Sequence, residues 1–318
     1  MLLGLLRDQE LDPTEFYTGT GHAPPVLSDA EQQAGEAPDA ASARDLPDWL
    51  WPRFKQALGP GAEAAAQVLR NRAPIVLRVN LRHCTRAQAI SGLVDDGIMT
   101  QPMETAKSAL QVTAGERKIS SSKLFKSGGV ELQDASSQAA VEAMDLRDGA
   151  RVLDYCAGGG GKTLAMAALA DCAWFAHDIS VPRLADLPPR ARRAGIDVEI
   201  LDGSALPRMA PFNMVLCDAP CSGSGTWRRN PEAKWALTPE RLRELTELQR
   251  QILSEAASLV APGGRLIYTT CSILTEENQE SVDRFLCDFP AWSKLQSRNW
   301  PISDQSDGFF FAELSRYS

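Results

Sequence analysis

The chain has 318 residues, of which 44% are hydrophobic and 23% are charged, and its formal net charge is −8. This composition is typical of a globular protein with one large and one smaller domain, and no apolar run approaches the roughly 18 residues that a membrane span requires. The acidic balance argues against a general nucleic-acid binder, because such proteins gain affinity from basic surface.

Seven cysteines are scattered along the chain without the basic start and cleavage site of an export signal. This pattern favours free thiols and a cytoplasmic location. Neither a Cys-x-x-Cys pair nor a His-Glu-x-x-His stretch occurs, so no zinc site is expected. We expect a cytoplasmic monomer that does not bind membranes.

The first 70 residues are predicted to be helical and irregular. Residues 1–8 resemble the last turns of a helix, and residues 20–48 are rich in Pro, Ala, Gly, Asp and Glu with little periodicity. We expect that part of a longer N-terminal domain is missing upstream of this segment. An aromatic stretch over residues 47–54 leads into a further helix.

Residues 71–132 are predicted to form a small α+β module that binds RNA. Residues 75–80, 109–112 and 130–133 read as strands, and Thr85 is suited to cap a helix that runs to Asp95. Three arginines of the first strand and its turn either contact RNA or form a solvated charged face; they are Arg78, Arg82 and Arg86.

Strands and helices alternate over residues 133–318, which predicts a mostly parallel sheet with helices on both faces. The predicted strands are 152–155, 174–178, 212–218 and 265–270, and residues 195–202 are predicted to be the end of a helix followed by a strand. The predicted helices are 133–144, 163–170, 181–194, 238–260 and 275–287. Residues 307–316 are strand-like and are expected to close one edge of the sheet.

A glycine-rich loop, Cys156 to Lys162, follows the first strand of this sheet. Ligands of such folds bind beyond the carboxyl ends of the strands, and glycines let the backbone approach them closely. A phosphate-binding P-loop that ends on Gly161-Lys-Thr needs glycine at position 156, where this chain has cysteine. The spacing G-x-G-x-x-G for a dinucleotide fails at Thr163, which leaves S-adenosylmethionine as the predicted cofactor.

Acidic residues end the next three strands. Asp178 is placed to accept hydrogen bonds from ribose hydroxyls, Asp202 to accept from an adenine amino group, and Asp218 ends the fourth strand. Each one alone is also suited to cap a helix or a turn. Three acids at successive strand ends around one glycine loop favour the cofactor-binding interpretation.

Cys221 and Cys271 each follow a predicted buried strand, and the sheet order of this fold class brings them together near the cofactor. A thiolate is a strong nucleophile once its pKa is lowered. Addition of a thiolate to C6 of cytosine activates C5 toward a methyl sulfonium, and an acid such as Asp218 near N3 stabilises the adduct. The residues alone do not decide which thiol attacks.

Several spaced motifs resemble the RsmB/Nop/Sun family of RNA cytosine-5 methyltransferases. The resemblance covers residues 75–318 and rests on the glycine loop and on the following motifs: Gln133-Asp-Ala-Ser-Ser-Gln138, Asp178-Ile-Ser-Val-Pro-Arg183, Asp218-Ala-Pro-Cys-Ser-Gly223, Thr270-Cys-Ser272, Glu276-Glu-Asn278 and Asp307-Gly-Phe-Phe310. The loop departs from the family pattern Ala-Pro-Gly-Gly-Lys, because Gly159 replaces the proline.

The resemblance implies a Rossmann-like class I methyltransferase domain with an antiparallel edge at the C-terminus, preceded by an RNA-recognition-like module. It also implies that residues 1–70 are the remnant of a longer RNA-binding domain. It implies that Cys271 is the nucleophile, that Cys221 assists release of the methylated RNA, and that Asp218 and Lys162 complete the catalytic group. It also implies a set of residues that bind S-adenosylmethionine: Cys156, Ala157, Gly158, Gly159, Gly160, Gly161, Lys162, Asp178, Arg183, Asp202 and Asp218.

The implied reaction is methylation of cytosine C5 in RNA, with 16S rRNA as the expected substrate and transfer RNA as an alternative. A non-catalytic RNA-binding assembly factor with the same fold is a second alternative, and a dehydrogenase is disfavoured by the broken dinucleotide spacing. Candidate RNA contacts follow Cys221; they are Trp227, Arg228, Arg229 and Lys234. The competing interpretation is that Trp227 and Trp235 pack on the long helix.

Overall fold

The computed structural model describes residues 2–8, 10–33 and 44–317, and the chain divides into two compact units between Pro52 and Arg53. The first unit contains the helices α1 (Leu2–Asp8) and α2 (Asp29–Gln33) and the 3-10 turn η1 (Pro13–Glu15). The helix predicted at the start of the chain is present, whereas residues 34–43 of the predicted irregular segment lie outside the described residues. The predicted domain limits at residues 70 and 132 stay predictions.

A run of helical turns leads into the second unit: α4 (Trp51–Leu58), η2 (Gly59–Gly61) and α5 (Ala62–Val68). Phe54 is fully buried and stacks on Trp227, with 5.9 Å between the ring centroids. Arg53 Nε lies 2.8 Å from Glu276 Oε1. These contacts attach the predicted aromatic segment to the loops of the larger sheet described below.

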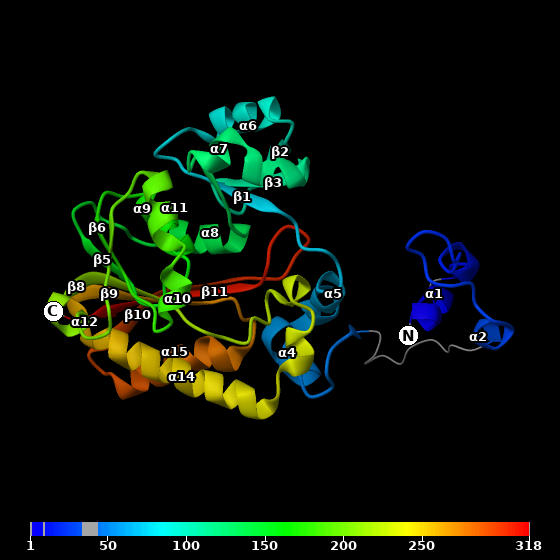
Figure 1. The fold of residues 1–318 in the computed structure, drawn as a ribbon. Helices are drawn as coiled ribbons and strands as arrows, with labels where there is room; N and C mark the ends of the chain where they lie inside the picture. The colour runs from blue at the N-terminus through cyan, green and yellow to red at the C-terminus, as the bar shows by residue number, and fades with distance from the viewer. Residues whose placement is uncertain (1, 9, 34–43, 318) are drawn as a thin grey trace. The chain divides into compact units, whose positions relative to one another are not determined.

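The predicted α+β module is confirmed as a four-stranded antiparallel sheet in the order β2-β3-β1-β4 (Figure 1). Its elements are β1 (Val76–Val79), α6 (Arg86–Asp95), β2 (Met99–Pro102), β3 (Ala109–Ala114), η3 (Glu116–Ser121), α7 (Lys123–Lys126) and β4 (Val130–Leu132). Thr85 caps α6 in a capping box with Gln88, as the sequence predicts. Leu77, Leu93 and Leu110 form part of its buried core.

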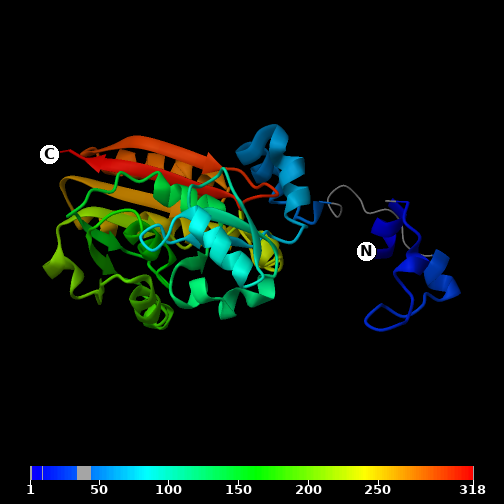
Figure 2. The same cartoon turned by 90° about the horizontal axis from the view of Figure 1, so that it is seen from above.

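The second sheet has seven strands in the order β10-β11-β9-β8-β5-β6-β7 (Figures 1 and 2). The pairs from β9 to β7 are parallel, whereas β11 is antiparallel to both β9 and β10. The strands are β5 (Arg151–Asp154), β6 (Ala173–Ala176), β7 (Val198–Ile200), β8 (Phe212–Asp218), β9 (Val260–Thr270), β10 (Trp292–Trp300) and β11 (Phe309–Arg316). This is the predicted Rossmann-like fold with an antiparallel edge.

Helices cover both faces of this sheet because successive apolar residues of each strand point to opposite sides. Leu153 and Val215 pack toward α14 (Pro239–Ser258) and α15 (Gln279–Asp288), whereas Val152 and Leu216 pack toward α8 (Ala135–Glu142) and α9 (Gly161–Ala167). The remaining helices and turns are α10 (Val181–Leu184), α11 (Leu187–Ala194), α12 (Leu206–Met209), η4 (Trp227–Arg229), α13 (Ala233–Ala236) and η5 (Thr275–Glu277). No helix within residues 2–8, 10–33 and 44–317 is long and apolar enough to cross a bilayer.

The C-terminal strand differs from the prediction in its place in the sheet. β11 does not close the edge, because β10 pairs with its outer side. The sequence of β10 is mostly polar and exposed, which is the pattern of an edge strand with one solvated face, and it gives little apolar signal. The helix predicted over residues 181–194 is interrupted, and Pro188 lies in the first turn of its second half, α11.

The three arginines predicted to face RNA or solvent all donate hydrogen bonds to oxygens of the protein, although the side chain of Arg82 remains 37% exposed. Arg78 is buried, and its Nη1 lies 2.7 Å from both Gln133 Oε1 and Gly161 O at the start of α9. Arg82 Nη1 donates to Ala167 O at 2.8 Å, and Arg86 Nη1 donates to Met103 O at 3.3 Å. Both predictions for Arg78 are wrong, because β1 is a central strand whose Arg78 side chain is covered by the large-sheet domain.

Replacing Arg78 by Ala is expected to lower the free energy of unfolding by about 2–4 kcal/mol, because two partly buried acceptors lose their donor and the buried aliphatic stem no longer packs. Urea denaturation checks this value. Arg72→Ala, at an exposed site, is the matched control and should change the free energy by less than about 0.5 kcal/mol. Equal effects of the two variants would contradict the conclusion that Arg78 stabilises the fold through its bonds to Gln133 and Gly161.

Candidate active site

The glycine loop joins β5 to α9 at the carboxyl ends of the parallel strands. Gly158 and Gly160 have φ angles of +51° and +78°, which favour glycine. A Cβ at Gly160 would lie 2.2 Å from Leu187 Cδ1, so α11 requires glycine there. Ala157 N donates to His177 O at 2.8 Å, which ties the loop to the end of β6.

Asp178 holds this loop from the end of the neighbouring strand. Its carboxylate is buried and accepts hydrogen bonds from Gly158 N and Ser180 N, both at 2.9 Å. Arg183 Nη1 lies 3.3 Å from the same carboxylate, and its side chain remains 59% exposed over Gly158. Asp178 and Arg183 are thus brought together with the loop, as the motifs predict, and part of the hydrogen-bonding capacity of Asp178 is used within the protein.

A cavity of about 680 Å³ opens beside Asp178. Apolar side chains form one part of its wall, among them Ile179, which is 95% exposed, and Ile200. Asp202 lines the cavity and is exposed; its Oδ1 accepts bonds from Ser204 N, Ser204 Oγ and Ala205 N. These hydrogen bonds, first that of the Ser204 hydroxyl, lower the pKa of Asp202. A carboxylate beside an exposed apolar wall fits a ligand with a flat ring and polar edges.

His177 is a lining residue of this cavity that the sequence analysis did not single out. Its Nδ1 lies 3.0 Å from Tyr155 O, and because a carbonyl oxygen only accepts, Nδ1 carries the proton in the neutral ring. The other nitrogen, Nε2, then has a free lone pair near Gly203, where it can accept a hydrogen bond. The position directly before Asp178 at the end of β6 is the only signal that the sequence offers for this residue.

The two thiols predicted to meet lie side by side, with 3.4 Å between Cys221 Sγ and Cys271 Sγ. Both residues are half-buried. The hydrogen bond from the Cys221 thiol lowers the pKa of Cys271, and the positive charge of Lys162 acts in the same direction. The same hydrogen bond, together with burial, raises the pKa of Cys221. When the pair loses one proton, these shifts favour the thiolate on Cys271 and the proton on Cys221.

Lys162 and Asp218 form a partly buried ion pair beside these thiols, with 2.6 Å between Nζ and Oδ2. Burial opposes the charge on Lys162, but the Asp218 carboxylate outweighs it and the pKa of Lys162 is raised. The ammonium also lies 5.0 Å from the centre of the Phe309 ring. Asp218 Oδ1 accepts a hydrogen bond from Thr269 Oγ1 at 3.0 Å. All four predicted catalytic residues thus lie in one cluster.

Two further titratable groups are Cys156, the first residue of the glycine loop, and Asp154 at the end of β5. Burial raises the pKa of the Cys156 thiol, which packs against the core beneath the sheet's carboxyl end. Burial also raises the pKa of Asp154 to about 7, although the hydrogen bond from Thr163 Oγ1 at 2.7 Å opposes this shift. Asp154 Oδ1 has no hydrogen-bond partner in the described part of the chain.

Four residues after Cys221 are predicted to contact RNA, and three of these predictions are wrong because the side chains are buried. Trp227 is 1% exposed and stacks on Phe54, Arg228 is buried against Asp307 with 2.7 Å between Nε and Oδ1, and Lys234 is buried. Arg229 pairs with Asp307 and Asp134, and 40% of its side chain is exposed. Trp235 is 54% exposed, so the alternative in which it packs away on the long helix is wrong as well.

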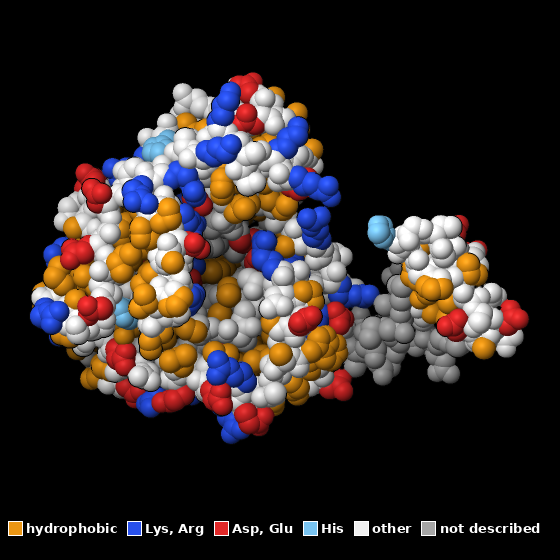
Figure 3. Space-filling view, in the orientation of Figure 1, with side chains coloured by type: hydrophobic (Ala, Val, Ile, Leu, Met, Phe, Trp, Pro, Cys, Tyr) orange, Lys and Arg blue, Asp and Glu red, His pale blue; other side chains and the backbone are white. Residues whose placement is uncertain are grey.

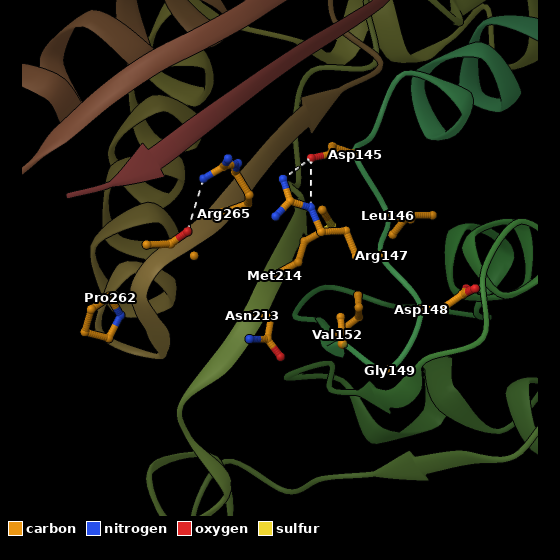
Figure 4. A pocket seen from close by; sticks show the side chains of 13 residues that line it. Asp145, Leu146, Arg147, Asp148, Gly149, Val152, Asn213, Met214, Pro262 and Arg265 are labelled. Atoms are coloured by element: carbon orange, nitrogen blue, oxygen red, sulfur yellow. Dashed lines mark hydrogen bonds and ion pairs between the residues drawn. The ribbon is translucent and has the colours of Figure 1, made fainter. Parts of the chain in front are cut away.

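A second cavity, of about 330 Å³, lies at the opposite ends of the parallel strands (Figure 4). Val152 and Asn213, at the starts of β5 and β8, line it, and Arg147 pairs with Asp145 at 2.7 Å. The thiols and the glycine loop are absent from its lining. The predicted site residues therefore belong to the carboxyl end of the sheet, as the fold requires.

The raised pKa of Asp154 predicts how stability depends on pH. Between the ordinary carboxyl value near 4 and about 7, the folded state holds a proton that the unfolded state has lost, so the free energy of unfolding falls as pH rises through this window and is level above it. The fall amounts to about 4 kcal/mol at most. Urea denaturation between pH 4 and 8 should show this component disappear in Asp154→Asn. The exposed Asp95→Asn should retain it, and a pH profile of Asp154→Asn that parallels the wild type would contradict the assignment.

Comparison with known proteins agrees with this geometry. The family of the 16S rRNA methyltransferase RsmB/F matches residues 141–315, and the ferredoxin-like domain of RsmF/B-like methyltransferases matches residues 46–117. Ribosomal RNA small subunit methyltransferase B of Cronobacter sakazakii is 32% identical over 307 residues, which are 91% of this chain and 71% of that protein.

Solved structures give the same result. The crystal structure of PH0851 has a TM-score of 0.81 at 31% identity and covers 91% of this chain and 71% of that chain. A methyltransferase homolog protein from Pyrococcus horikoshii has a TM-score of 0.76 at 25% identity and covers 87% of this chain and 98% of that chain. The resemblance predicted from the motifs is confirmed, and this chain belongs to the 16S rRNA methyltransferase RsmB/F family.

Proposed function

We propose that this protein methylates C5 of a cytosine in 16S rRNA through a covalent bond between Cys271 and C6 of the base. The observation that carries the proposal is the pair of thiols 3.4 Å apart, next to the Lys162–Asp218 ion pair and the glycine loop. A base in a duplex is inaccessible to such a site, so the target cytosine is unpaired or flipped out of its stack.

The thiol pair is suited to the chemistry of cytosine C5. The Cys271 thiolate adds to C6, the electron pair moves toward N3, and N3 takes a proton that Asp218, with Lys162 beside it, positions. C5 thereby becomes nucleophilic enough to be methylated. A base then removes the C5 proton, the electrons of the C5–H bond re-form the C5–C6 double bond, and the S–C6 bond breaks with its electron pair returning to the sulfur of Cys271. This releases 5-methylcytosine, and we assign assistance of the release to Cys221.

The family uses S-adenosylmethionine, which supplies a methyl group on a sulfonium. The residues present fit this group: positive-φ glycines approach it closely, and the exposed apolar wall beside Asp202 suits its adenine. We assign binding to residues 156–162 and to Asp178, Arg183, Asp202 and Asp218. His177 Nε2, as an acceptor, is a further candidate partner for the adenine amino group.

An RNA substrate also accords with the surface of the second unit. A cavity of about 640 Å³ lies between the small sheet and the catalytic domain, lined by Phe125 and Ile119 from the module and by Arg229. Figure 3 shows this face hollowed between the two, with Lys and Arg side chains around the hollow. Local positive charge of this kind attracts a phosphate backbone although the whole chain is acidic.

We propose that the protein acts as a cytoplasmic monomer.

The proposal is tested by incubating the protein with labelled S-adenosylmethionine and either naked 16S rRNA or small ribosomal subunits, followed by mapping of 5-methylcytosine. We expect one labelled cytosine in an unpaired or flipped position. Transfer RNA is the comparison substrate. Cofactor binding without label in any of these RNAs would contradict a catalytic role.

The roles of the thiols are separable by substitution. Cys221→Ala is expected to accumulate a covalent protein–RNA adduct, because addition proceeds and release is impaired, whereas Cys271→Ala is expected to form no adduct and to lose at least about 10³-fold in rate. A denaturing gel shift with 16S rRNA measures the adduct. Cys287→Ala, at an exposed thiol, should behave as the wild type; an adduct trapped in Cys271→Ala would reverse the assignment.

A further inference from the structure

The glycine loop contains four consecutive glycines, residues 158–161. Glycine loses more conformational freedom on folding than any other residue, so a loop of this kind needs attachments from outside to keep one conformation. Two of its carbonyl oxygens accept hydrogen bonds from arginine side chains. Arg78 Nη1 donates to Gly161 O at 2.7 Å, and Arg190 Nη1 donates to Gly159 O. The two arginines therefore hold the loop at two of its four glycines.

Both attachments lead to the small module. Arg78 belongs to β1 of that module. Arg190 belongs to α11 of the catalytic domain, but it pairs with Glu131 of β4, with 3.1 Å between Nη2 and Oε2. β1 and β4 are antiparallel neighbours whose register sets Arg78 opposite Glu131. Because directly opposite residues project from the same face of a sheet, one face of the small sheet supplies both a donor for Gly161 and a carboxylate for Arg190.

Glu131 orients the guanidinium that reaches the loop. Its side chain is only 6% exposed, and its other oxygen, Oε1, lies 2.6 Å from Arg193 Nη2, so two arginines compensate the buried charge. Arg190 uses Nη1 for Gly159 and Nη2 for Glu131, and both ends of one planar guanidinium are thereby fixed. The Gly159 oxygen is held through a chain of contacts that begins on the small module.

We infer that Glu131 is a positioning residue for S-adenosylmethionine. It acts through Arg190, which holds Gly159 in the conformation that binds the cofactor. The inference rests on the proposed function, in which residues 156–162 bind this cofactor, and it extends that function by making the cofactor site depend on the small module. The small module thus has a role in cofactor binding besides the RNA binding proposed above.

Isothermal titration calorimetry of the whole chain with S-adenosylmethionine measures the Kd, and thermal unfolding of the same protein measures its Tm. Arg190→Ala frees the Gly159 oxygen, so fewer molecules hold the loop in the binding conformation, and the Kd should rise about tenfold. Glu131→Gln keeps the size of the side chain but removes the charge that orients Arg190, and the Kd should rise about threefold.

Arg193→Ala is the matched control. Arg193 lies on the same helix and pairs with the same carboxylate, but its guanidinium lies over the Phe125 ring, 5.0 Å from the ring centre. The variant removes one ion pair between the module and the catalytic domain, so it should lower the Tm while the Kd for S-adenosylmethionine equals that of the wild type. A merely structural role of Glu131 would instead give Glu131→Gln and Arg193→Ala the same Kd.

A double variant tests whether Glu131 acts through Arg190. In the Arg190→Ala background, Glu131→Gln should leave the Kd unchanged, because the side chain that connects Glu131 to the loop is gone. A second rise as large as that in the wild-type background would overturn the inference. If Arg190→Ala does not fold, the comparison of Glu131→Gln with Arg193→Ala still decides, since equal Kd values in these two variants contradict the inference.

Binding by the wild type separates this inference from the proposed function. If the wild type does not bind S-adenosylmethionine, the proposed cofactor site fails and the inference fails with it. If the wild type binds the cofactor and Glu131→Gln binds it equally well, only the role of Glu131 is overturned.

Discussion

The parallel pairing of β8 with β9 is the constraint on which the site depends. Its register sets Asp218 opposite Thr269, and their side chains share a hydrogen bond of 3.0 Å. Cys221 lies three residues beyond Asp218, and Cys271 lies two residues beyond Thr269. Two segments that are 50 residues apart in the sequence thus leave the sheet together, and the thiols meet at 3.4 Å. A shift of one residue in this register would turn one of the thiols away.

Buried polar groups then hold the loops that follow these strands. Gly225 N donates to Cys271 O at 2.9 Å, and Gly308 N donates to Gly225 O at 3.0 Å. A Cβ at Gly225 would lie 2.2 Å from Gly308 O, so the close crossing of the two backbones requires glycine. Arg228 and Arg229 both pair with Asp307. The loop after Cys221 is therefore attached to β9 and to the segment before β11, which limits the freedom of both thiols.

The sequence was informative where a motif is local and less informative where a partner is distant. The alternation of apolar strands and helices predicts the parallel sheet, and the glycine loop and the thiols at strand ends predict the site. The polar β10 gives no comparable signal, because an edge strand needs few apolar residues. The buried Glu277 belongs to the motif Glu276-Glu-Asn278, yet its hydrogen-bond partner Ser222 lies 55 residues away in the sequence. Single residues such as Arg228 look like nucleic-acid contacts until Asp307 is seen beside them.

Many arginines of this acidic chain are bound to other groups of the protein, which limits how much they can contribute to RNA binding. Arg78, Arg82 and Arg228 bind oxygen atoms of the protein itself. Arg190 and Arg193 of α11 both pair with Glu131 of β4. All of these contacts except that of Arg228 join the small module to the catalytic domain. These basic residues therefore hold the surface of the small module in place against the surface of the catalytic domain that carries the thiols. If RNA binds between those surfaces, selection of the target rests on the shape of the hollow and on access of one base to Cys271 more than on the total charge.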